Sequence, residues 1–352
     1  MDVSIEQLRE NLRRYYGEVL SSSKDLATNA CCVGGAPPDF VLDALARVDA
    51  RVQERFYGCG WPISQALRGA TVVDLGCGTG RDVYVLSQLV GPDGFVHGVD
   101  MTANQLAVGQ QTLVSHMERF GYERANVAFH QDFIEEAAAV PDGSADVIVS
   151  NCVVNLSPMK DRVLANCARM LRPGGEVYLS DVFADRRLDP ELAADPLLHA
   201  ECLGGASYLH DFLDLARATG FADPRIVKRA PITIQNPAIQ RRVGGARFES
   251  VTLRLLLLPE LERRCEDYGQ VATYAGGMDE APALFWLDDH HCFEAGRPER
   301  VCGNTADMLT KTRFARWFEV TPRRWHMGEF PCGPTMASNL HAPASGGGGA
   351  CC

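Results

Sequence analysis

The pattern of hydrophobic and polar positions changes at about residue 71, where short apolar runs begin to alternate with segments of helical periodicity. Residues 72–75 form the first apolar run, and apolar side chains in the next stretch recur at helical spacing. Strands that alternate with helices pair in parallel through right-handed crossovers. The pattern therefore predicts an α/β fold with a doubly wound sheet. Further strand-like runs lie at residues 95–100, 127–130, 145–150, 176–183, 226–234 and 251–258.

The segments on either side of this alternating region differ from it. Helical segments at about 5–20 and 41–56 precede the first strand, so we expect them to form a lid over the cleft. An insertion at 185–210 follows the fifth strand, and an aromatic-rich stretch after the sheet predicts a small α+β domain. The expected parts are an N-terminal helical lid (1–65), a sheet domain (66–260), a small C-terminal domain (261–326) and a flexible tail (327–352).

Length and charge narrow the range of functions. A chain of 352 residues is long enough for one large domain and a smaller one. Its formal charge of -11, without a Lys/Arg cluster, argues against a nucleic-acid partner and favours a small-molecule substrate. The apolar runs are too short for a membrane span, and the N-terminus lacks the apolar core of a secretory signal. We expect a monomeric, cytoplasmic protein with no membrane partner.

The first apolar run ends in Asp74 and a glycine-rich turn that contains Gly76, Gly78 and Gly80. Alternate glycines let the backbone approach a bulky ligand. A dinucleotide fingerprint would need another glycine where Arg81 stands. The pattern instead resembles the first motif of class I S-adenosylmethionine-dependent methyltransferases, whose fold is Rossmann-like. In that family the acid and the turn amides hold the amino-acid end of the cofactor, although a glycine-rich structural turn remains the alternative.

Later strand ends supply the other predicted cofactor contacts. Asp100 ends the second strand, at the position where folds of this type place a carboxylate on the ribose hydroxyls. By resemblance to the methyltransferases, Asp132 with Phe133 is assigned to the adenine. The remaining predicted cofactor contacts are Tyr57, Arg81, Met101, Gln105, Asn151 and Cys152.

The chain has 13 cysteines, which in a cytosolic protein do not form a disulfide framework. Cys152 follows the fourth strand, and ligands of open α/β sheets bind beyond the carboxyl ends of the strands. We therefore expect Cys152 to face the transferred methyl group. Cys167 belongs to the apolar face of a helix and is expected to be a packed core thiol.

Six ordered blocks of the sequence resemble arsenite methyltransferases, and they cover about residues 15–318. They are YYGEVLSSSKDLATNACC, RFYGCG, DLGCGTGRDVYVLSQLVG, SNCVVNLSPMK, ECLGGASY and LDDHHCFEAGRPERVCGNT. The resemblance implies transfer of methyl groups from S-adenosylmethionine to trivalent arsenic, giving methylarsenite and then dimethylated arsenic, in arsenic detoxification. It assigns Cys152 and Cys202 as the inner arsenic-binding pair, Cys59 as the third sulfur, and Cys31 as an upstream thiol that exchanges with Cys59. The neighbouring Cys32 is an alternative to Cys31.

Thiolates suit this chemistry, because trivalent arsenic is soft and three thiolates leave it a lone pair. Zinc in a closed tetrahedral site has no such pair. The family further implies a Cys31–Cys59 disulfide that thioredoxin or glutathione reduces before the next turnover.

Other readings remain open at this point. The chain could be a methyltransferase for another small molecule, or a thiol-based metalloid binder without catalysis. Glu201, beside Cys202, either tunes the site or is a solvated helix residue. Zinc is disfavoured because the spacing of the candidate ligands matches no zinc-finger pattern. Those candidates are Cys265, His290, His291, Cys292 and Cys302.

Overall fold

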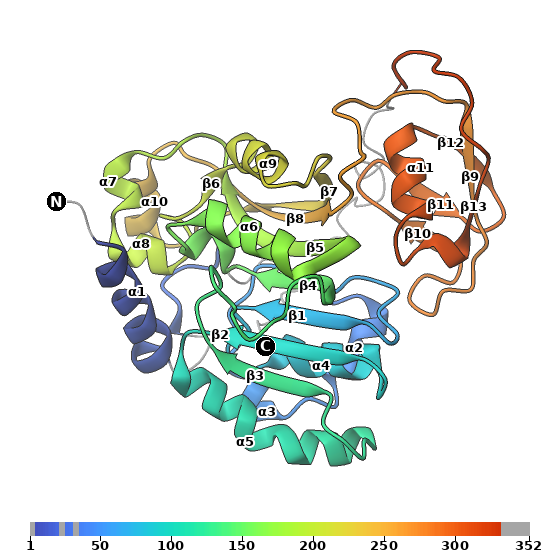
Figure 1. Cartoon of the computed structure of the whole chain (residues 1–352). Coiled ribbons are helices and arrows are strands. Elements are labelled where there is room, and N and C mark those ends of the chain that lie inside the picture. Colours follow the sequence, from blue (N-terminus) through green and yellow to red (C-terminus); the bar gives the residue numbers. More distant parts are fainter. Residues whose placement is uncertain (1–3, 21–24, 31–34, 332–352) are drawn as a thin grey trace, which may run out of the picture.

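A sheet of eight strands organises the computed structural model, which describes residues 4–20, 25–30 and 35–331. The main path of the sheet has the order β3-β2-β1-β4-β5-β8-β7, and β6 pairs with β5. Figure 1 shows the small C-terminal domain beside the β7–β8 side of the sheet, with helix α1 on the opposite side of the molecule. The strands are β1 (Thr71–Leu75), β2 (Phe95–Asp100), β3 (Val127–Gln131), β4 (Ala145–Asn151), β5 (Leu171–Ala184), β6 (Ser207–Tyr208), β7 (Arg225–Ile232) and β8 (Phe248–Leu256).

The predicted parallel sheet is confirmed for the first five strands, which pair in parallel. Strands β7 and β8 extend the sheet as expected, but β8 is antiparallel to both β5 and β7. Strand β5 begins earlier than its apolar run, and its register with β4 shifts between Ala145 and Val147. Its regular pairing starts at Glu176, where the predicted strand begins.

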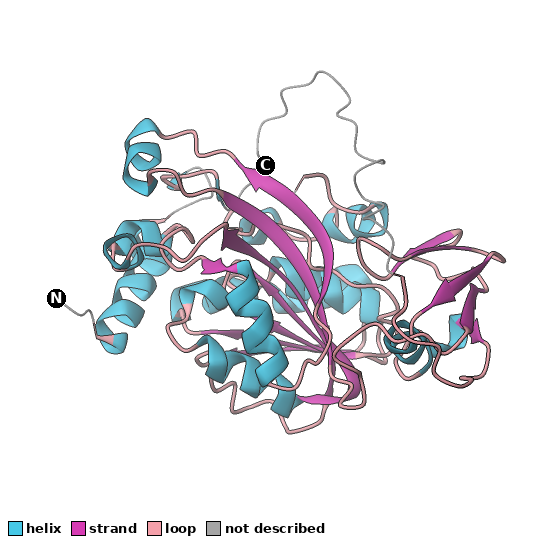
Figure 2. Ribbon diagram, turned by 90° about the horizontal axis from the view of Figure 1, so that it is seen from above, coloured by secondary structure: helices cyan, strands magenta, loops and turns pink. Residues whose placement is uncertain are grey.

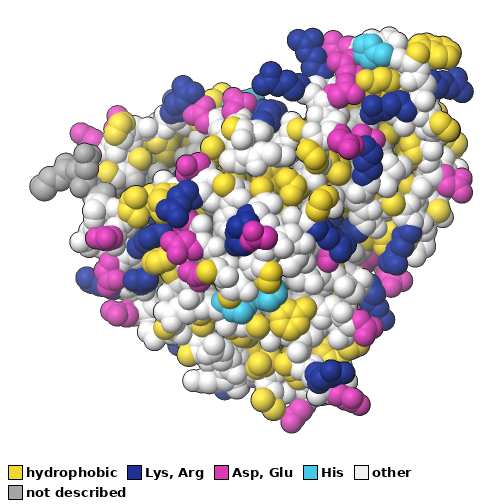
Figure 3. All heavy atoms as spheres, viewed as in Figure 1, with side chains coloured by type: hydrophobic (Ala, Val, Ile, Leu, Met, Phe, Trp, Pro, Cys, Tyr) yellow, Lys and Arg dark blue, Asp and Glu magenta, His cyan; other side chains and the backbone are white. Residues whose placement is uncertain are grey.

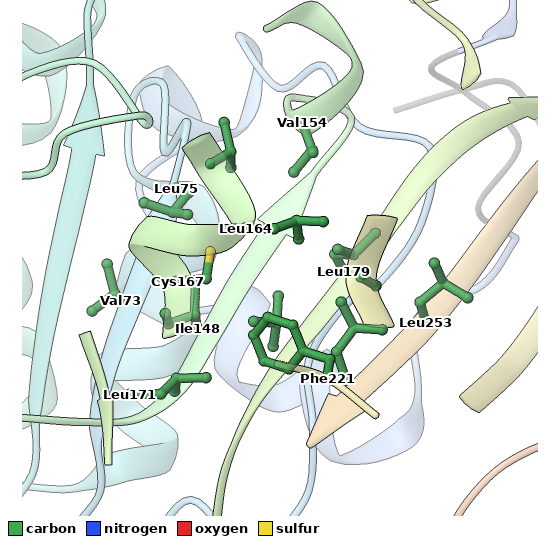
Figure 4. Close-up of a cluster of buried hydrophobic side chains, with 14 of the residues drawn as sticks. Val73, Leu75, Ile148, Val154, Leu164, Cys167, Leu171, Leu179, Phe221 and Leu253 are labelled. Carbon is green, nitrogen blue, oxygen red and sulfur yellow. The ribbon is translucent and has the colours of Figure 1, made fainter. Parts of the chain in front are cut away.

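Helices cover both faces of the sheet, as expected for a doubly wound fold (Figure 2). One buried apolar cluster contains residues of α2, α4 and α5, and another contains residues of α6 and α9. Figure 4 shows Cys167 of α6 within the second cluster, so the prediction of a packed core thiol is confirmed. The helices of this part are α1 (Ile5–Arg14), η1 (Tyr15–Val19), α2 (Asp39–Leu45), α3 (Ala50–Gln53), α4 (Arg81–Val90), α5 (Ala103–Phe120), η4 (Val154–Leu156), α6 (Lys160–Met170), α7 (Pro190–Ala193), α8 (Pro196–Ala200), α9 (Leu209–Ala218) and α10 (Pro237–Val243).

The N-terminal segment differs from the prediction in one respect. The single helix expected at 41–56 is divided into α2 and α3. The carboxylate of Asp49 accepts a hydrogen bond from the backbone N–H of Arg51 and caps a new helix there. The chain therefore turns between the two helices, and the residues after α3 lead to Tyr57 and Cys59.

The C-terminal domain is held to the sheet by buried ion pairs. Glu176 of β5 pairs with Arg254 of β8 at 3.0 Å and also with Arg313 of the domain. Burial alone would raise the pKa of Glu176, but the two guanidinium groups outweigh it and lower that pKa. The elements of the domain are β9 (Gln270–Tyr274), β10 (Leu284–Trp286), β11 (Cys292–Glu294), β12 (Pro298–Val301), α11 (Gly303–Thr310), η5 (Ala315–Trp317) and β13 (Phe318–Val320).

The first residues of the tail that was predicted to be loose from residue 327 make backbone hydrogen bonds to the C-terminal domain. The backbone N–H of Met327 donates to the carbonyl of Asp267, and that of Phe330 donates to the carbonyl of Cys265. The expectation was wrong for residues 327–331, because these hydrogen bonds tie them to the C-terminal domain. The rest of the predicted tail lies outside the described residues.

Surface charge is mixed on the face shown in Figure 3, where Lys and Arg side chains are interspersed with Asp and Glu. This face carries no concentrated basic patch of the kind that binds nucleic acid. Among the helices of the described ranges, none combines the length and the apolar character that crossing a bilayer requires.

Candidate functional site

The glycine-rich turn after β1 forms one wall of a cavity at the carboxyl ends of the parallel strands. All three glycines have positive φ angles. At Gly76 a Cβ atom would lie 2.3 Å from the side chain of Val153, so a larger residue does not fit. At Gly78 the position of a Cβ is open space, so the turn leaves room for a ligand there.

The cavity has a volume of about 120 Å³, and the N-terminal segment contributes to it. Small-molecule cavities usually measure roughly 300–1,000 Å³, so lining groups must move apart to admit a molecule the size of a nucleoside. The lining residues taken from the N-terminal segment are Arg9, Leu12, Tyr16, Arg55, Phe56 and Tyr57. This placement is the one expected of a lid.

Acidic and basic side chains both line the cavity: the acids are Asp74, Asp82, Asp100 and Glu135, and the bases are Arg9, Arg55 and Arg81. Asp74 is buried, and burial together with the neighbouring Asp82 and Asp100 raises its pKa well above the usual value. Arg81 opposes that shift, and it lies within 2.6 Å of Asp82. A ligand with positive charge would relieve the repulsion among these acids. S-adenosylmethionine carries an ammonium and a sulfonium, and these positive charges would be favourable beside Asp74 and Asp100.

Asp100 is held in place by the turn that it faces. One carboxylate oxygen accepts a hydrogen bond from the backbone N–H of Gly78 at 2.9 Å, and the other accepts one from Thr102 at 2.8 Å. Burial raises the pKa of Asp100, and these hydrogen bonds oppose the rise. Asp100 and Met101 line the cavity, and their contact with a ribose stays a prediction.

Two other predicted residues present buried polar atoms at the cavity wall. The Tyr57 hydroxyl and the Gln105 Oε1 make no hydrogen bond of ordinary geometry with another described residue, although Gln105 lies close enough to the Tyr57 hydroxyl to oppose the rise of its pKa. Buried polar groups rarely stay without a partner, so these atoms fit the role of ligand contacts. The Gln105 amide donates to the carbonyl of Tyr16 at 2.7 Å, which joins α5 to the lid.

Asp132 occupies a different position from the other predicted cofactor residues. Its carboxylate accepts hydrogen bonds from the backbone N–H groups of Phe133 and Ala138, both at 2.8 Å. Phe133 lines the cavity, whereas Asp132 is not among the lining residues. Asp132 thus shapes the loop, and its contact with adenine stays a prediction.

The cavity also contains acids that the sequence argument did not select. Glu135 is buried, and it accepts a hydrogen bond from the Ser157 hydroxyl at 2.5 Å. Asp82 lies between Arg81 and Asn151, and the Asn151 amide is 3.3 Å from its carboxylate. Both acids stand within three residues of a predicted contact in the sequence, and that proximity was the available signal.

The predicted thiols gather at the edge of this cavity. The sulfur atoms of Cys59 and Cys152 form a disulfide, and the Cys202 sulfur lies 3.4 Å from the Cys152 carbonyl oxygen. Cys59 and Cys202 are fully buried, and Cys152 is 2% exposed. Chain segments from the lid, the sheet and the insertion thus bring three distant cysteines together. Cys31 lies outside the described residues, but the preceding Ala30 packs in the same buried cluster as these cysteines.

The recorded disulfide differs from the pairing that the family resemblance implied. The expected bond joined Cys31 to Cys59, whereas the structure joins Cys59 to Cys152. A sulfur atom forms one disulfide at a time, so the two pairings exclude each other within one state. Cys59 lies beside Cys152 because distant segments of the chain pack together. The spacing of cysteines in the sequence does not reveal such packing.

Backbone strain marks two of the three thiols. Cys152 and Cys202 have φ angles of 58° and 62°, and only four residues other than glycine have positive φ in the described ranges. Such conformations cost roughly 1–3 kcal/mol and are concentrated at functional sites. The insertion is fitted closely to the loop after β4, because a Cβ at Gly205 would lie 2.1 Å from the carbonyl oxygen of Asn155.

Glu201 is a buried anchor and not a solvated helix residue. Its carboxylate accepts hydrogen bonds from the Tyr15 hydroxyl, from the backbone N–H of Ala27 at 2.7 Å, and from both the N–H and the hydroxyl of Thr28. The residue before Cys202 therefore fastens the N-terminal segment to the thiol site.

The zinc candidates of the C-terminal domain do not form a set of three ligand atoms around one point. In the described part of the chain, one such group exists, and it consists of Asp288, Asp289 and His290. His290 is already 2.5 Å from the carboxylate of Asp289.

Comparisons with known proteins agree with this architecture. The methyltransferase domain family matches residues 67–230, and the arsenite methyltransferase C-terminal domain family matches residues 268–342. The chain is 49% identical to an arsenite methyltransferase of Aquipseudomonas alcaligenes, over 98% of this chain and 100% of that protein. It is 40% identical to the human arsenite methyltransferase, over 90% of this chain and 84% of that protein.

A solved structure is similar as well. The arsenic(III) S-adenosylmethionine methyltransferase of Chlamydomonas reinhardtii superposes with a TM-score of 0.81 at 45% identity, covering 84% of this chain and all of that one. The similarity extends through both domains and nearly the full length, which a shared methyltransferase fold alone does not produce. The chain therefore belongs to the arsenite methyltransferase family of S-adenosylmethionine-dependent enzymes.

Proposed function

We propose that this protein transfers methyl groups from S-adenosylmethionine to trivalent arsenic held by Cys59, Cys152 and Cys202. The observation that carries the proposal is that these three cysteines lie in one cluster and that one of them, Cys152, lines the cofactor cavity. The products are methylarsenite and then dimethylated arsenic, and the role is arsenic detoxification. The relatives' names support the choice of arsenic as substrate.

Different residues of the cavity would bind different parts of S-adenosylmethionine. Asp74 would hold the ammonium of the cofactor, and Asp100 would accept hydrogen bonds from the ribose hydroxyls. When bound, S-adenosylmethionine supplies an electrophilic methyl group on a sulfonium. Tyr57, Gln105 and Phe133 complete the wall, and the lid excludes the water that competes for arsenic.

The thiols prepare the substrate for attack. Three thiolates hold arsenic in a pyramid and leave its lone pair free. With the cofactor bound, that pair would form the carbon–arsenic bond as the carbon–sulfur bond of the sulfonium breaks, and the electron pair of the broken bond would stay on sulfur. Arsenic is thereby oxidised by two electrons. Two thiolates return the electrons by forming one disulfide, and the Cys59–Cys152 bond is in the position to be that product.

A thiol reductant must then reduce the disulfide, and either thioredoxin or glutathione has the required chemistry. A compartment that keeps thiols reduced, such as the cytoplasm, suits this requirement. The monomeric state and the exchange role of Cys31 stay predictions from the sequence.

The decisive assay combines the protein with arsenite, a thiol reductant and S-adenosylmethionine, followed by separation of the arsenic species. The proposal predicts methylated arsenic that disappears when S-adenosylmethionine is omitted. Tight binding of arsenite without any methylated product would instead favour a metalloid-binding protein.

A further inference from the structure

A second cavity, of about 670 Å³, adjoins the same disulfide. Its wall includes Cys59 but not Cys152, whereas the cofactor cavity is lined by Cys152 but not by Cys59. Each sulfur of the disulfide thus belongs to a residue that borders a different cavity. The second cavity is formed by residues 36–40 before and within α2, by strands β7 and β8, and by residues 279–286 of the C-terminal domain.

The side chains that line the second cavity include both charged and aromatic groups. Lys228 of β7 provides a cation, and Asp39, Asp279 and Glu280 provide anions. The Ser250 hydroxyl lines the cavity and donates to the carbonyl oxygen of Cys59 at 2.9 Å. A small molecule with a carboxylate and an ammonium finds partners for both charges here. The aromatic lining residues are Phe40, Trp61, Tyr178 and Trp286.

We propose that the second cavity binds the low-molecular-mass thiol that reduces the Cys59–Cys152 disulfide. This inference depends on the proposed function only in assigning the disulfide to the catalytic cycle. A thiolate in the cavity attacks the Cys59 sulfur and forms a mixed disulfide, and Cys152 leaves as a thiolate. A second thiolate attacks the mixed disulfide at the sulfur of the small thiol. The small-molecule disulfide departs, Cys59 becomes a thiolate, and two electrons have entered the protein.

Burial favours a small thiol over a protein reductant. Cys59 is fully buried and Cys152 is 2% exposed, so any reductant needs a local opening to reach a sulfur atom. A small thiol already in the second cavity needs a smaller opening than the active thiol of a folded protein. A cavity of about 670 Å³ lies within the range that holds drug-sized ligands. A peptide thiol such as glutathione has a suitable size, and its ammonium and one of its carboxylates find opposite charges on the acids of the lining and on Lys228.

The proposal gives the C-terminal domain a role in the reaction. The domain packs beside β7 and β8 (Figure 1), where the backbone N–H of Asp289 donates to the carbonyl of Ile226 at 2.8 Å. Its residues 279–286, which include β10, close one side of the second cavity. The domain therefore shapes the access of thiols to Cys59 from the side away from the cofactor.

The test measures reduction of the oxidised full-length protein by glutathione, without arsenic or S-adenosylmethionine. Ala230→Trp fills the cavity from β7, and Arg229→Trp is the matched control, because Arg229 is exposed on the same strand and does not line the cavity. We expect Ala230→Trp to slow reduction at least about tenfold and Arg229→Trp to leave the rate unchanged. The first adduct detected by mass spectrometry should carry glutathione on Cys59.

A second variant does not depend on tolerance of a large side chain. Lys228 is exposed, so Lys228→Glu is not expected to disturb folding. Lys228→Glu should slow reduction by anionic glutathione several-fold, because one charged contact is lost. Reduction by uncharged 2-mercaptoethanol should stay unchanged.

Three results would overturn the inference. The first is that both tryptophan variants slow reduction by glutathione equally. The second is that the first glutathione adduct forms on Cys152. The third is that thioredoxin reduces the disulfide faster than glutathione does, at a rate that Ala230→Trp does not change. Because the assay contains neither arsenic nor cofactor, a protein that behaves as expected here but does not methylate arsenite would refute the proposed function alone.

Discussion

Cys152 and Cys167 are both buried thiols, yet they belong to regions with different physical demands. Cys167 lies on the regular helix α6, among apolar side chains of the core, and burial raises its pKa to about 12. Cys152 follows β4 in a left-handed backbone conformation, at the wall of the cofactor cavity and beside two other thiols. Burial alone therefore does not identify a reactive cysteine. Position at a strand end and backbone strain separate the two.

The largest expected effect comes from replacing the site thiol. Cys152→Ser removes one arsenic ligand and should lower methylation of both arsenite and methylarsenite by at least about a hundredfold. Cys167→Ser is the matched control, and it should keep both activities while the free energy of unfolding falls by about 1–3 kcal/mol. Product analysis and denaturant unfolding check the pair. Similar loss of activity in the two variants would erase the distinction between site and core thiols.

Cys59→Ser should separate the two methylation steps. Arsenite has three exchangeable positions, whereas methylarsenite has two and, in the proposed scheme, requires only Cys152 and Cys202. We expect the variant to lose the first methylation and to retain turnover of methylarsenite, with the two electrons then coming from Cys152 and Cys202 or from the added thiol reductant. Initial rates with each substrate give the answer, and equal loss of both steps would contradict the assignment of Cys59 as the third ligand.

The cofactor side of the site is tested at Asp100. Asp100→Asn removes a charged acceptor that faces the cavity, so the affinity for S-adenosylmethionine should fall by about 10- to 100-fold. Asp93→Asn, at an exposed position before β2, serves as the control and should bind normally. Isothermal titration calorimetry measures both. Unchanged affinity in Asp100→Asn would remove Asp100 from the cofactor site.

The last prediction concerns stability and not the reaction, and it is made at Asp181, which supports the loop after β4. Its carboxylate accepts a hydrogen bond from the backbone N–H of Asn155 at 3.0 Å, and burial raises its pKa to about 6. Because the pKa of Asp181 is higher in the folded than in the unfolded protein, protonation of this carboxyl stabilises the fold. That stabilisation is fully present below about pH 4 and is lost as the pH rises through 6. The stability of the unchanged protein relative to Asp181→Asn should therefore fall by up to about 3 kcal/mol between pH 4 and 7. Urea unfolding across that range tests the sign, and a relative stability that is flat or rises with pH would contradict it.

Features with a local or periodic signal could be predicted from the sequence. The run that ends at Asp74, with its alternate glycines, locates the cofactor turn, and parallel pairing places Cys152 at the edge beside it. Helical periodicity also identifies Cys167 as a core residue. Each of these depends on neighbours in the sequence or on a general rule of parallel sheets.

Features that depend on distant packing could not be predicted. The Cys59–Cys152 bond joins segments that are 93 residues apart. The anchoring role of Glu201 requires knowing that residues 27 and 28 pack against it. The second cavity exists because the C-terminal domain packs against β7 and β8, and no pattern within either segment encodes that contact.

The central claim is that three sulfur atoms from distant parts of the chain bind one arsenic atom at the cofactor cavity. Arsenic K-edge X-ray absorption on the reduced, arsenite-loaded protein tests it most directly. The account predicts three sulfur neighbours around arsenic in the unchanged protein and in Cys167→Ser, and replacement of one sulfur by oxygen in Cys59→Ser. A sulfur count in Cys59→Ser equal to that of the unchanged protein would contradict it.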